Sequence, residues 1–578
     1  MTITSITYVT SIIKIFDDLN HPEGSIESRI QNFILLAKTG IPLLIYISSE
    51  YLVLLEPYLE IYPNLKIGKV MELKDTFVSK VYDSVLSSDK IELPERRSEI
   101  KDTTNNILLT NAKIEFVKNA VLENPFGSTH FAWIDFNIFH MFKRNPSYAA
   151  EVLKTMSTRT FQTEDFLILP GCWDYNWGEP YALVHKICWR FCGSFFLGSA
   201  KSILDFNEVY ETRFRDFLAK HKVLTWEVNF WSAMESEKQY SPIWYKADHN
   251  ESIFDFTADI CSSGIEYTKS VRYNYPYLEE YVPTSMSHFY DNANRKHVLN
   301  TRFVNYTILP DGCYMIRNVH RHLYTRNMAS VFDENIDFGE LNSVTELTEM
   351  REKEELQNYP GAKYFGLEDI RLYQLDGENK IRFVSSNTNH VPNLKIRICS
   401  GVYDIATGEC SEFRVLHPPT DTWCEKNWIP LPKAPVDEEA GEYFVYKWMP
   451  FEIGRLDDTD QLHIVKSYAH NTPFWRGVRG SSVPIETNDG YLCVVHFSEE
   501  KSPRHYFHLL VLLDKETYKP LKYSRFFYFH KKSVEFCIGF SMKDCVYQFW
   551  ISNFDRDPEY LEVPCSAIDL CYDIIYVE

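Results

Sequence analysis

The chain has 578 residues, more than one hydrophobic core usually serves, so its length predicts two or three domains. Its 60 basic and 80 acidic residues give a net charge of −20, and no block of the chain is rich in Lys or Arg. We therefore expect no nucleic-acid partner, because phosphate backbones are bound by basic surfaces. Aromatic residues reach 15%, which favours sugar binding only slightly, since β-rich folds also collect aromatics.

The 13 cysteines are scattered, without CxxC pairs or zinc-like spacing. This predicts a reducing compartment in which cysteine serves as a small core residue. The N-terminal residues lack a basic segment followed by an uninterrupted apolar run, and no apolar run reaches the roughly 18 residues that a membrane span needs. We expect a cytoplasmic protein with no membrane span.

The first 260 residues alternate strand-like and helix-like segments. Strands are expected at Ile6–Ile13, Pro42–Ile47, Lys66–Val70 and Thr129–Ile134, and helices at Ser25–Ala37 and Asn111–Val121. This alternation predicts a largely parallel sheet covered by helices. Ligands of such sheets bind at the carboxyl ends of the strands, where Asp135 closes the segment FAWID.

From about Tyr290 the pattern changes to short strands of period two separated by turn signals. Such segments are Arg302–Ile308, Tyr314–Arg317, Ile381–Ser385, Lys395–Cys399, Tyr443–Trp448, Tyr491–Phe497, Tyr506–Leu513, Ser524–Phe529 and Val546–Ser552. Roughly 290 residues of short strands suit an all-β five-bladed propeller, with a large β-sandwich as the alternative. The Tyr- and Pro-rich segment Ser262–Ser287 is the expected connector, which gives domains at 1–262 and 288–578 and a linker at 263–287.

Two oxygen donors follow the predicted strand of the first domain. In WIDFN, Asp135 and Asn137 stand two residues apart and offer a carboxylate and a further oxygen to Mn²⁺ or Mg²⁺. The remaining positions of the ion would take the diphosphate of a nucleotide sugar, so that the ion neutralises charge on the departing nucleotide. The alternative is that Asp135 only caps the helix that follows.

The first domain resembles the HtrL/YibB-like family, which is regarded as GT-A glycosyltransferases. The resemblance is carried by YVTSIIKIFD (Tyr8–Asp17), THFAWIDFNIFH (Thr129–His140), CGSFFLGS (Cys192–Ser199), TWEVNFWS (Thr225–Ser232) and YKADHN (Tyr245–Asn250). It implies a GT-A-like, Rossmann-like nucleotide-sugar domain whose WID segment lies beside the metal and whose GxFF segment lines the acceptor side. The family usually has small residues after WID and an acidic pair near TWEVNF, where this chain keeps only Glu227. The loss of one carboxylate implies weaker metal binding, or a Lys or Arg that shares the charge-neutralising role.

Three further side chains of the first domain are candidates. Glu227 could take the proton of an acceptor hydroxyl in an inverting displacement, or be a solvated residue at a helix end. His249 follows the last strand, where GT-A enzymes often place a third metal ligand, and would favour Mn²⁺; the alternative is a histidine in a surface turn. Lys113, on the helix before the metal strand, could hold a phosphate of the nucleotide or be plain surface charge.

Polar clusters interrupt the β pattern of the second domain. They are TRN (Thr325–Asn327), GLEDIR (Gly366–Arg371), CEKNWIP (Cys424–Pro430), RGVRGSSVP (Arg476–Pro484), VVHFS (Val494–Ser498), PRHYFH (Pro503–His508) and VEFCIGF (Val534–Phe540). Propeller blades point their innermost strands at one funnel, so these clusters would converge on a polyhydroxylated ligand. The alternative for any one cluster is a turn or a salt bridge between blades. The candidate substrate-binding residues are Arg326, Glu368, Arg371, Lys426, Arg479, His496, Arg504, Tyr506, His508 and Glu535.

These clusters resemble, in order and content over about Asn300–Asp557, the five-bladed propeller of mannoside phosphorylases (family 130 of the glycoside hydrolases) and propellers appended to microbial and viral glycosyltransferases. In the phosphorylases the Asp of G-x-E-D-x-R is the general acid, which implies that role for Asp369. Adjacent residues of a strand point to opposite faces, so only one of Glu368 and Asp369 is expected to face the funnel, with Arg371 sharing the face of Asp369. Ile370 replaces the phosphorylases' Pro, which favours sugar binding over phosphorolysis.

The sequence thus predicts a metal-dependent glycosyltransferase that uses a nucleotide sugar to build glycan on a glycan or glycoprotein acceptor. The propeller would be a second glycosyl-transferring site or an acceptor-binding module. One alternative is a glycoside phosphorylase or hydrolase that acts through Asp369. The other is a non-catalytic glycan-binding protein.

Overall fold

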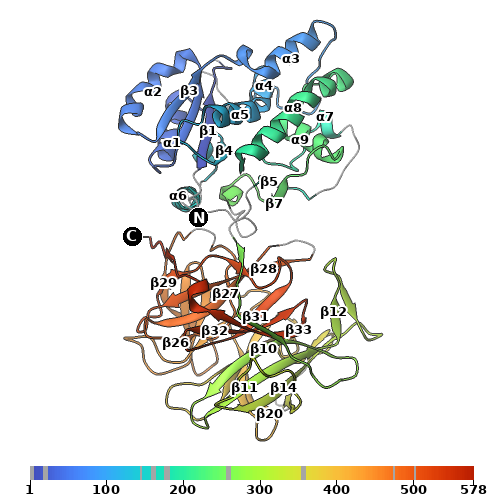
Figure 1. The fold of residues 1–578 in the computed structure, drawn as a ribbon, viewed down its shortest axis with the longest axis vertical. Helices are drawn as coiled ribbons and strands as arrows, with labels where there is room; N and C mark the ends of the chain where they lie inside the picture. The colour runs from blue at the N-terminus through green and yellow to red at the C-terminus, as the bar shows by residue number, and fades with distance from the viewer. Residues whose placement is uncertain are drawn as a thin grey trace. The chain divides into compact units, whose positions relative to one another are not determined.

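The computed structural model divides into two compact units, Met1–Cys261 and Ser262–Glu578. Figure 1 draws the helices of the first unit around its sheet and the strands of the second. The residues that the structure describes are 6–16, 24–142, 146–157, 165–174, 182–254, 262–352, 359–472, 475–499 and 503–577. Within these ranges, none of the helices combines the length and the apolar character needed to cross a bilayer.

The first unit is built on a mixed sheet. Its strands are β1 (Ile6–Ile12), β2 (Leu43–Ile47), β3 (Leu65–Val70), β4 (His130–Ile134), β5 (Leu167–Gly171), β6 (Phe195–Ser199) and β7 (Ile243–Lys246), in the order β3-β2-β1-β4-β6-β5-β7. β1 pairs in parallel with β2 and β4, whereas β6 runs antiparallel to both β4 and β5. The expected largely parallel sheet is therefore present, with β6 as its reversed strand.

Helices flank this sheet (Figure 1). They are α1 (Ile26–Ala37), α2 (Ser49–Ile61), α3 (Phe77–Leu86), α4 (Thr104–Asn111), α5 (Lys113–Glu123), α6 (Pro146–Met156), α7 (Ala182–His185), α8 (Ala200–His221) and α9 (Glu227–Ser236), with the 3₁₀ turns η2 (Leu73–Asp75), η3 (Ile138–Met141) and η4 (Glu251–Phe254). α1 begins where Ser25 caps the amide of Ser28, and it buries the apolar face that includes Ile30 and Phe33.

The start of α5 lies beside the carboxyl end of β4. α5 packs on β1 and β4, and Phe116 stacks on Trp133 with ring centroids 6.0 Å apart. The helix expected over Asn111–Val121 begins only at Lys113, because α4 ends at Asn111. A lysine in a first helical turn faces the positive end of the helix dipole, so its charge needs acceptors from other elements.

The second unit is all-β, and its sheets have a propeller-like arrangement. Among the residues that the structure describes, the strands form five groups of four, of which the last takes β9 from the start of the unit: β10 (Val282–Asp291), β11 (Lys296–Val304), β14 (Leu323–Asp333), β15 (Thr348–Glu352); β17 (Glu368–Tyr373), β18 (Arg382–Asn387), β19 (Arg397–Asp404), β20 (Glu409–Leu416); β21 (Ile429–Leu431), β22 (Tyr443–Trp448), β23 (Phe451–Leu456), β24 (Leu462–Tyr468); β25 (Arg479–Gly480), β27 (Tyr491–Glu499), β28 (His505–Leu513), β29 (Pro520–Tyr523); and β31 (Glu535–Lys543), β32 (Val546–Asn553), β33 (Arg556–Pro564), β9 (Lys269–Arg272). Neighbours within each group are antiparallel, and a parallel pairing of β15 with β20 joins the first two groups.

Short elements complete the second unit. They are β8 (Ser263–Gly264), β12 (Tyr306–Ile308), β13 (Tyr314–Ile316), β16 (Tyr364–Phe365), β26 (Ile485–Glu486), β30 (Phe527–Tyr528), β34 (Tyr572–Asp573) and the 3₁₀ turn η5 (Cys565–Ala567). Successive four-stranded sheets are the arrangement of a propeller rather than of a sandwich, in which two larger sheets pack face to face.

The range 263–287, expected as a linker, is part of the second unit. It contains β8, β9 and the first part of β10, and β9 supplies the fourth strand of the last group by pairing with β33. Glu559 of β33 faces Arg272 in this pairing, and the hydroxyl of Ser270 donates to its carboxylate. The sequence of this segment suggests a connector because β8 and β9 are short and polar, and they are ordered by pairing with the distant strands β30 and β33.

Candidate functional site

A buried lysine joins the two carboxylates that the sequence singled out in the first unit. Lys113 is 7% exposed, and its Nζ lies 3.0 Å from Oε1 of Glu227 and 3.1 Å from Oδ1 of Asp135. It also donates to the main-chain oxygen of Gly193 at 2.8 Å. Burial opposes the charged form of Lys113, but the charges of Asp135 and Glu227 outweigh burial and raise its pKa above the usual value. Lys113 is thus a charged bridge between two acids.

Asp135 presents its carboxylate to this bridge instead of capping a helix. Its N–H donates to the main-chain oxygen of Ser194 at 3.0 Å, and its Oδ1 accepts from the indole N–H of Trp133 at 2.7 Å. The turn η3 that follows has Asn137, not Asp135, at its N-cap. The carboxylate remains 35% exposed, so it is open to a ligand from solvent.

Gly193 explains part of the GxFF motif. A Cβ at this position would lie 2.2 Å from Oε1 of Glu227, inside any allowed contact. Glycine therefore lets Glu227, at the start of α9, approach the strand that carries Cys192–Ser199. Glu227 is 5% exposed, so it is a buried acid held by Lys113 and not a solvated residue at a helix end.

A hollow opens beside Asp135, at the carboxyl ends of β1 and β4. It is lined by Ser11, Ile13, Ile15, Phe16, Arg29, Lys101, Asn106, Leu109, Thr110, Lys113, Trp133, Asp135, Phe136, Asn137 and His140. The strand order reverses direction about β1 and β4, and such a switch point is where open α/β sheets bind ligands. Arg29, Lys101 and His140 were not predicted. Arg29 of α1 and Lys101, in a turn before α4, carry positive charge into the hollow, but neither belongs to a motif.

Two of the predicted metal ligands have other partners. Asn137 is 4% exposed, and its Oδ1 accepts from the side-chain amide of Asn32 at 2.7 Å. His249 is absent from the lining of this hollow in the part of the chain that the structure describes. Its Nδ1 lies 3.6 Å from Sγ of Cys172, and its ring meets Trp189 edge-on at 4.2 Å. Lys113, predicted to hold a phosphate, directs its ammonium group to protein acceptors.

In the second unit a buried arginine gathers the acids of the GLEDIR motif. Arg302 on β11 is 5% exposed and donates to Oδ1 of Asp369 at 3.0 Å and to Oε1 of Glu368 at 3.1 Å. Lys426 donates to the second oxygen of Glu368 at 2.7 Å. Arg302 lies outside every predicted polar cluster, and no local motif in its strand marks it as a site residue.

The expectation that Glu368 and Asp369 point to opposite faces is wrong, because both contact Arg302. The pairing of β17 with β18 shifts register between Glu368 and Arg371, and Asp369 has a left-handed φ of 53°. Such a bulge breaks the alternation of side chains along a strand. Nη1 of Arg371 donates to the main-chain oxygen of Asp369 at 3.1 Å.

A third acid, Asp555, belongs to the same electrostatic neighbourhood. Its Oδ2 accepts from the hydroxyl of Tyr306 at 2.8 Å. Burial raises the pKa of Asp555, and the nearby Asp369 and Glu368 raise it further, against the effect of Arg302 and the Tyr306 hydrogen bond. Burial also acts to raise the pKa of Glu368, but Lys426 and Arg302 outweigh it and hold that pKa well below the usual range. The site therefore separates a charged acid from one that keeps its proton more readily, the pattern of acid–base sites.

Other predicted residues lie around this cluster. Tyr506 is hydrogen-bonded to Arg504, and the negative charges of Asp555 and Asp369 act to raise its pKa. Arg479 is exposed and lines a hollow beside Lys426, together with Cys424, Asn427, Tyr446, Lys447, Trp448, Met449, Trp475, Gly477, Val478 and Gly480. Lys426 and Arg479 thus line the same hollow.

Several predicted binding residues are instead buried and form hydrogen bonds with main-chain groups. Arg371 is 2% exposed and donates to the main-chain oxygen of Ser481 at 2.6 Å. Glu535 is fully buried and accepts three main-chain N–H groups, from Phe529, His530 and Lys531.

The two predicted histidines and Arg326 also have protein environments. His496 is 2% exposed and bonded to Ser481, and fully buried His508 packs on Phe529 with ring centroids 4.8 Å apart. Arg326 pairs with Glu349 at 2.7 Å. The alternation of side chains along a strand does not predict which of them reach the funnel and which pack against neighbouring protein.

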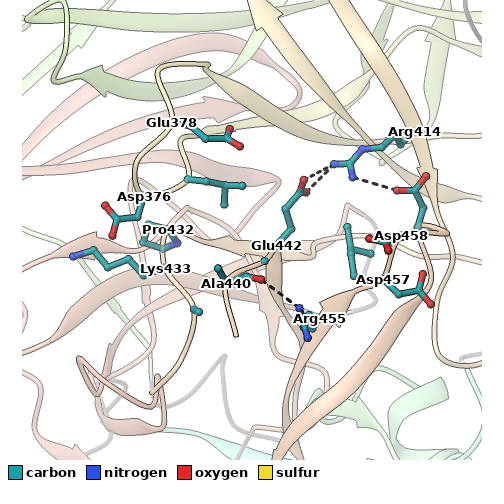
Figure 2. Close-up of a pocket in the computed structure, with 15 residues that line it drawn as sticks. Asp376, Glu378, Arg414, Pro432, Lys433, Ala440, Glu442, Arg455, Asp457 and Asp458 are labelled. Atoms are coloured by element: carbon teal, nitrogen blue, oxygen red, sulfur yellow. Dashed lines mark hydrogen bonds and ion pairs between the residues drawn. The ribbon is translucent and has the colours of Figure 1, made fainter. Parts of the chain in front are cut away.

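The charged side chains that line a second hollow pair with groups of the protein itself (Figure 2). Glu442, which precedes β22, accepts from Arg414 of β20 with both oxygens, at 2.7 and 2.8 Å. Arg414 also donates to Asp460 at 3.2 Å, and Arg455 donates to the main-chain oxygen of Ala440 at 3.3 Å. The pairs of Arg414 link the second group of strands to the third, and none of these residues belongs to a predicted polar cluster.

The chain therefore joins an α/β domain with a charged hollow at its sheet edge to an all-β, propeller-like domain. A family model described as "Bacterial protein of unknown function (HtrL_YibB)" matches residues 30–223. No curated protein matches the chain.

Solved structures similar to the chain include two named phosphorylases and a glycosyl hydrolase. Beta-1,2-mannobiose phosphorylase from Listeria innocua is 13% identical and covers 51% of this chain and 97% of its own, with a TM-score of 0.33. A mannose phosphorylase from Leishmania mexicana is 13% identical and covers 54% and 94%, with a TM-score of 0.33. A glycosyl hydrolase from Bacteroides ovatus is 11% identical and covers 54% and 97%, with a TM-score of 0.35.

Proposed function

We propose that the first unit is a glycosyltransferase domain that binds a nucleotide sugar, with a divalent cation, in the hollow beside Asp135. The observation that carries this proposal is the bridge from Asp135 through Lys113 to Glu227, at the carboxyl ends of the sheet. One acid is open to solvent and the other is buried, so the two can serve different steps. The acceptor is a glycan or a glycoprotein.

The donor set suits Mg²⁺ or Mn²⁺ with few protein ligands. Asp135 offers one partly exposed carboxylate, and Trp133 and Lys113 both contact its Oδ1, so Oδ2 would be the oxygen that binds a cation. Mg²⁺ in particular often keeps several waters and takes one or two carboxylates plus substrate phosphates. A bound ion would supply charge neutralisation at the leaving diphosphate. Asn137 could contribute only if its amide oxygen left Asn32.

The protein side chains divide the remaining work. Arg29 and Lys101, which line the hollow, would attract the anionic diphosphate. Glu227 would accept the proton of the attacking hydroxyl at Oε2, because its Oε1 is held by Lys113. Lys113 would hold both carboxylates in their charged form, because its ammonium group contacts each of them.

Calorimetry with nucleoside diphosphates and Mn²⁺ tests this proposal. Binding should require the ion and should collapse in Asp135→Ala. Asp205→Ala is the matched control, because Asp205 is an exposed acid of α8 that pairs with Lys201. Binding that is unchanged in Asp135→Ala and in the presence of chelator would contradict the proposal.

A second activity is proposed for the propeller-like unit, on the observation that Glu368, Asp369 and Asp555 meet around Arg302. We infer that this cluster handles a proton during glycosyl transfer or cleavage, with the hollow between Lys426 and Arg479 holding the sugar or phosphate. Asp369→Asn and Asp555→Asn should each slow the reaction by about 10²-fold while glycan binding persists. Glycan binding lost with turnover unchanged would make this a recognition site only.

A further inference from the structure

Three metal-binding side chains meet at the sheet edge of the first unit. Cys172 follows β5, Cys192 precedes β6, and His249 follows β7. Their donor atoms, two sulfurs and one ring nitrogen, all lie within 4.8 Å of one another. Cys192 is buried, Cys172 is half-buried, and the side chain of His249 is 37% exposed. The cluster is therefore anchored in the domain and open on one side.

Two of the three separations are close to the edges of a zinc tetrahedron. Zn–S bonds of about 2.3 Å and Zn–N bonds of about 2.0 Å place two sulfurs about 3.8 Å apart, and a sulfur and a nitrogen about 3.5 Å apart. The Sγ atoms of Cys172 and Cys192 are 3.5 Å apart, and Sγ of Cys172 is 3.6 Å from Nδ1 of His249. A disulfide would need sulfurs at about 2.05 Å. The side chains are thus spaced for an ion between them.

We propose that Cys172, Cys192 and His249 bind Zn²⁺. Two thiolates and an imidazole are ligands that zinc takes readily, whereas Mg²⁺ and Mn²⁺ prefer oxygen. A water or the nearby carboxylate of Asp248, whose Oδ1 lies 3.7 Å from Sγ of Cys172 and 3.5 Å from Nδ1 of His249, would complete the coordination. Each thiol gives up its proton on binding.

The zinc holds together the ends of three strands next to the proposed active site. The main-chain N–H of Cys192 donates to Pro170 of β5, and Ala247 donates to Gly171 in the same strand. The residues after Cys192 supply the oxygens that bind Lys113 and the N–H of Asp135. The zinc site is separate from the cation at Asp135, and its existence does not depend on the proposed transferase activity.

Metal analysis of the full-length protein, purified with a non-chelating reductant, tests the site. We expect about one zinc per chain, lost in Cys172→Ser, Cys192→Ser and His249→Ala. Cys188→Ser is the matched control, because Cys188 is half-buried nearby and lies outside the cluster. Asp135→Asn should also keep its zinc. If Cys192→Ser does not fold, His249→Ala provides the test instead, because His249 is partly exposed.

Cobalt substitution gives a second measurement. Co²⁺ added to the metal-free protein should produce thiolate charge-transfer absorption and the visible bands of tetrahedral cobalt, absent in Cys172→Ser. A wild-type protein that retains no zinc and gives no such spectrum would overturn the proposal. So would a mass two hydrogens lower under reducing purification, which would identify a disulfide between the cysteines. Equal zinc in wild type and Cys172→Ser would place the metal elsewhere.

Discussion

Replacing Lys113 by methionine tests whether the bridge of the first unit is a buried ionic network. Methionine keeps most of the volume but removes the charge, so Glu227 is left 5% exposed without its cation. Removing one partner of a buried ion pair costs about 3–5 kcal/mol. Asp135 is 35% exposed and regains water, so its share of the loss is small and the lower end of this range is expected.

Lys118→Met supplies the matched comparison on the same helix. Lys118 pairs with Glu211 at 2.7 Å, but the two side chains are 29% and 28% exposed. Pairs near the surface contribute about 0–1 kcal/mol. Urea unfolding of the full-length protein, followed through the first unit's transition near neutral pH, should therefore separate the variants by about 2 kcal/mol or more. Equal destabilisation by both would refute the view that Lys113 compensates buried charge.

Three further changes test the sites and the boundary. Gly193→Ala should displace Glu227 and slow transfer at least tenfold with little change in donor affinity, since the added Cβ meets a carboxylate oxygen at 2.2 Å; unchanged turnover would show that Glu227 is not the base. Because the folded-state pKa of Glu368 is lowered, its contribution to stability is present above about pH 4.5 and is lost as pH falls towards 2. Glu368→Gln should therefore weaken the acid sensitivity of the second unit in that window, as measured by pH-dependent urea unfolding, and identical profiles would argue against the pairing. A fragment beginning at Ser262 should unfold cooperatively, whereas one beginning at Pro283 lacks β9 and should be less stable or insoluble; equal melting temperatures would contradict the role of β9.

The sequence was sufficient for features that depend on local periodicity. The apolar face of Ser25–Ala37 predicted a helix, and α1 occupies Ile26–Ala37. The strand ending at Asp135 was placed correctly, as was the change to short strands in the second half. These features follow from the repeat of apolar residues along a few turns or strand positions, which needs no distant partner.

The sequence did not predict features that depend on pairing between distant segments of the chain. The bulge at Asp369 needs the register between β17 and β18, and it alone brings Glu368 and Asp369 to the same arginine. That arginine, Arg302, has no local motif. β9 was taken for a linker because four residues of mixed polarity order only against β33.

The cysteine cluster shows most directly what only the tertiary structure decided. Cys172 stands 20 residues before Cys192 and 77 before His249, so no short spacing marks a metal site. β5 lies between β6 and β7 in the sheet, and because β6 is antiparallel to β5 it begins at the edge where β5 and β7 end. Strand order and direction therefore set the 3.5 Å between the sulfurs, because residues at neighbouring strand ends approach whatever their separation along the chain.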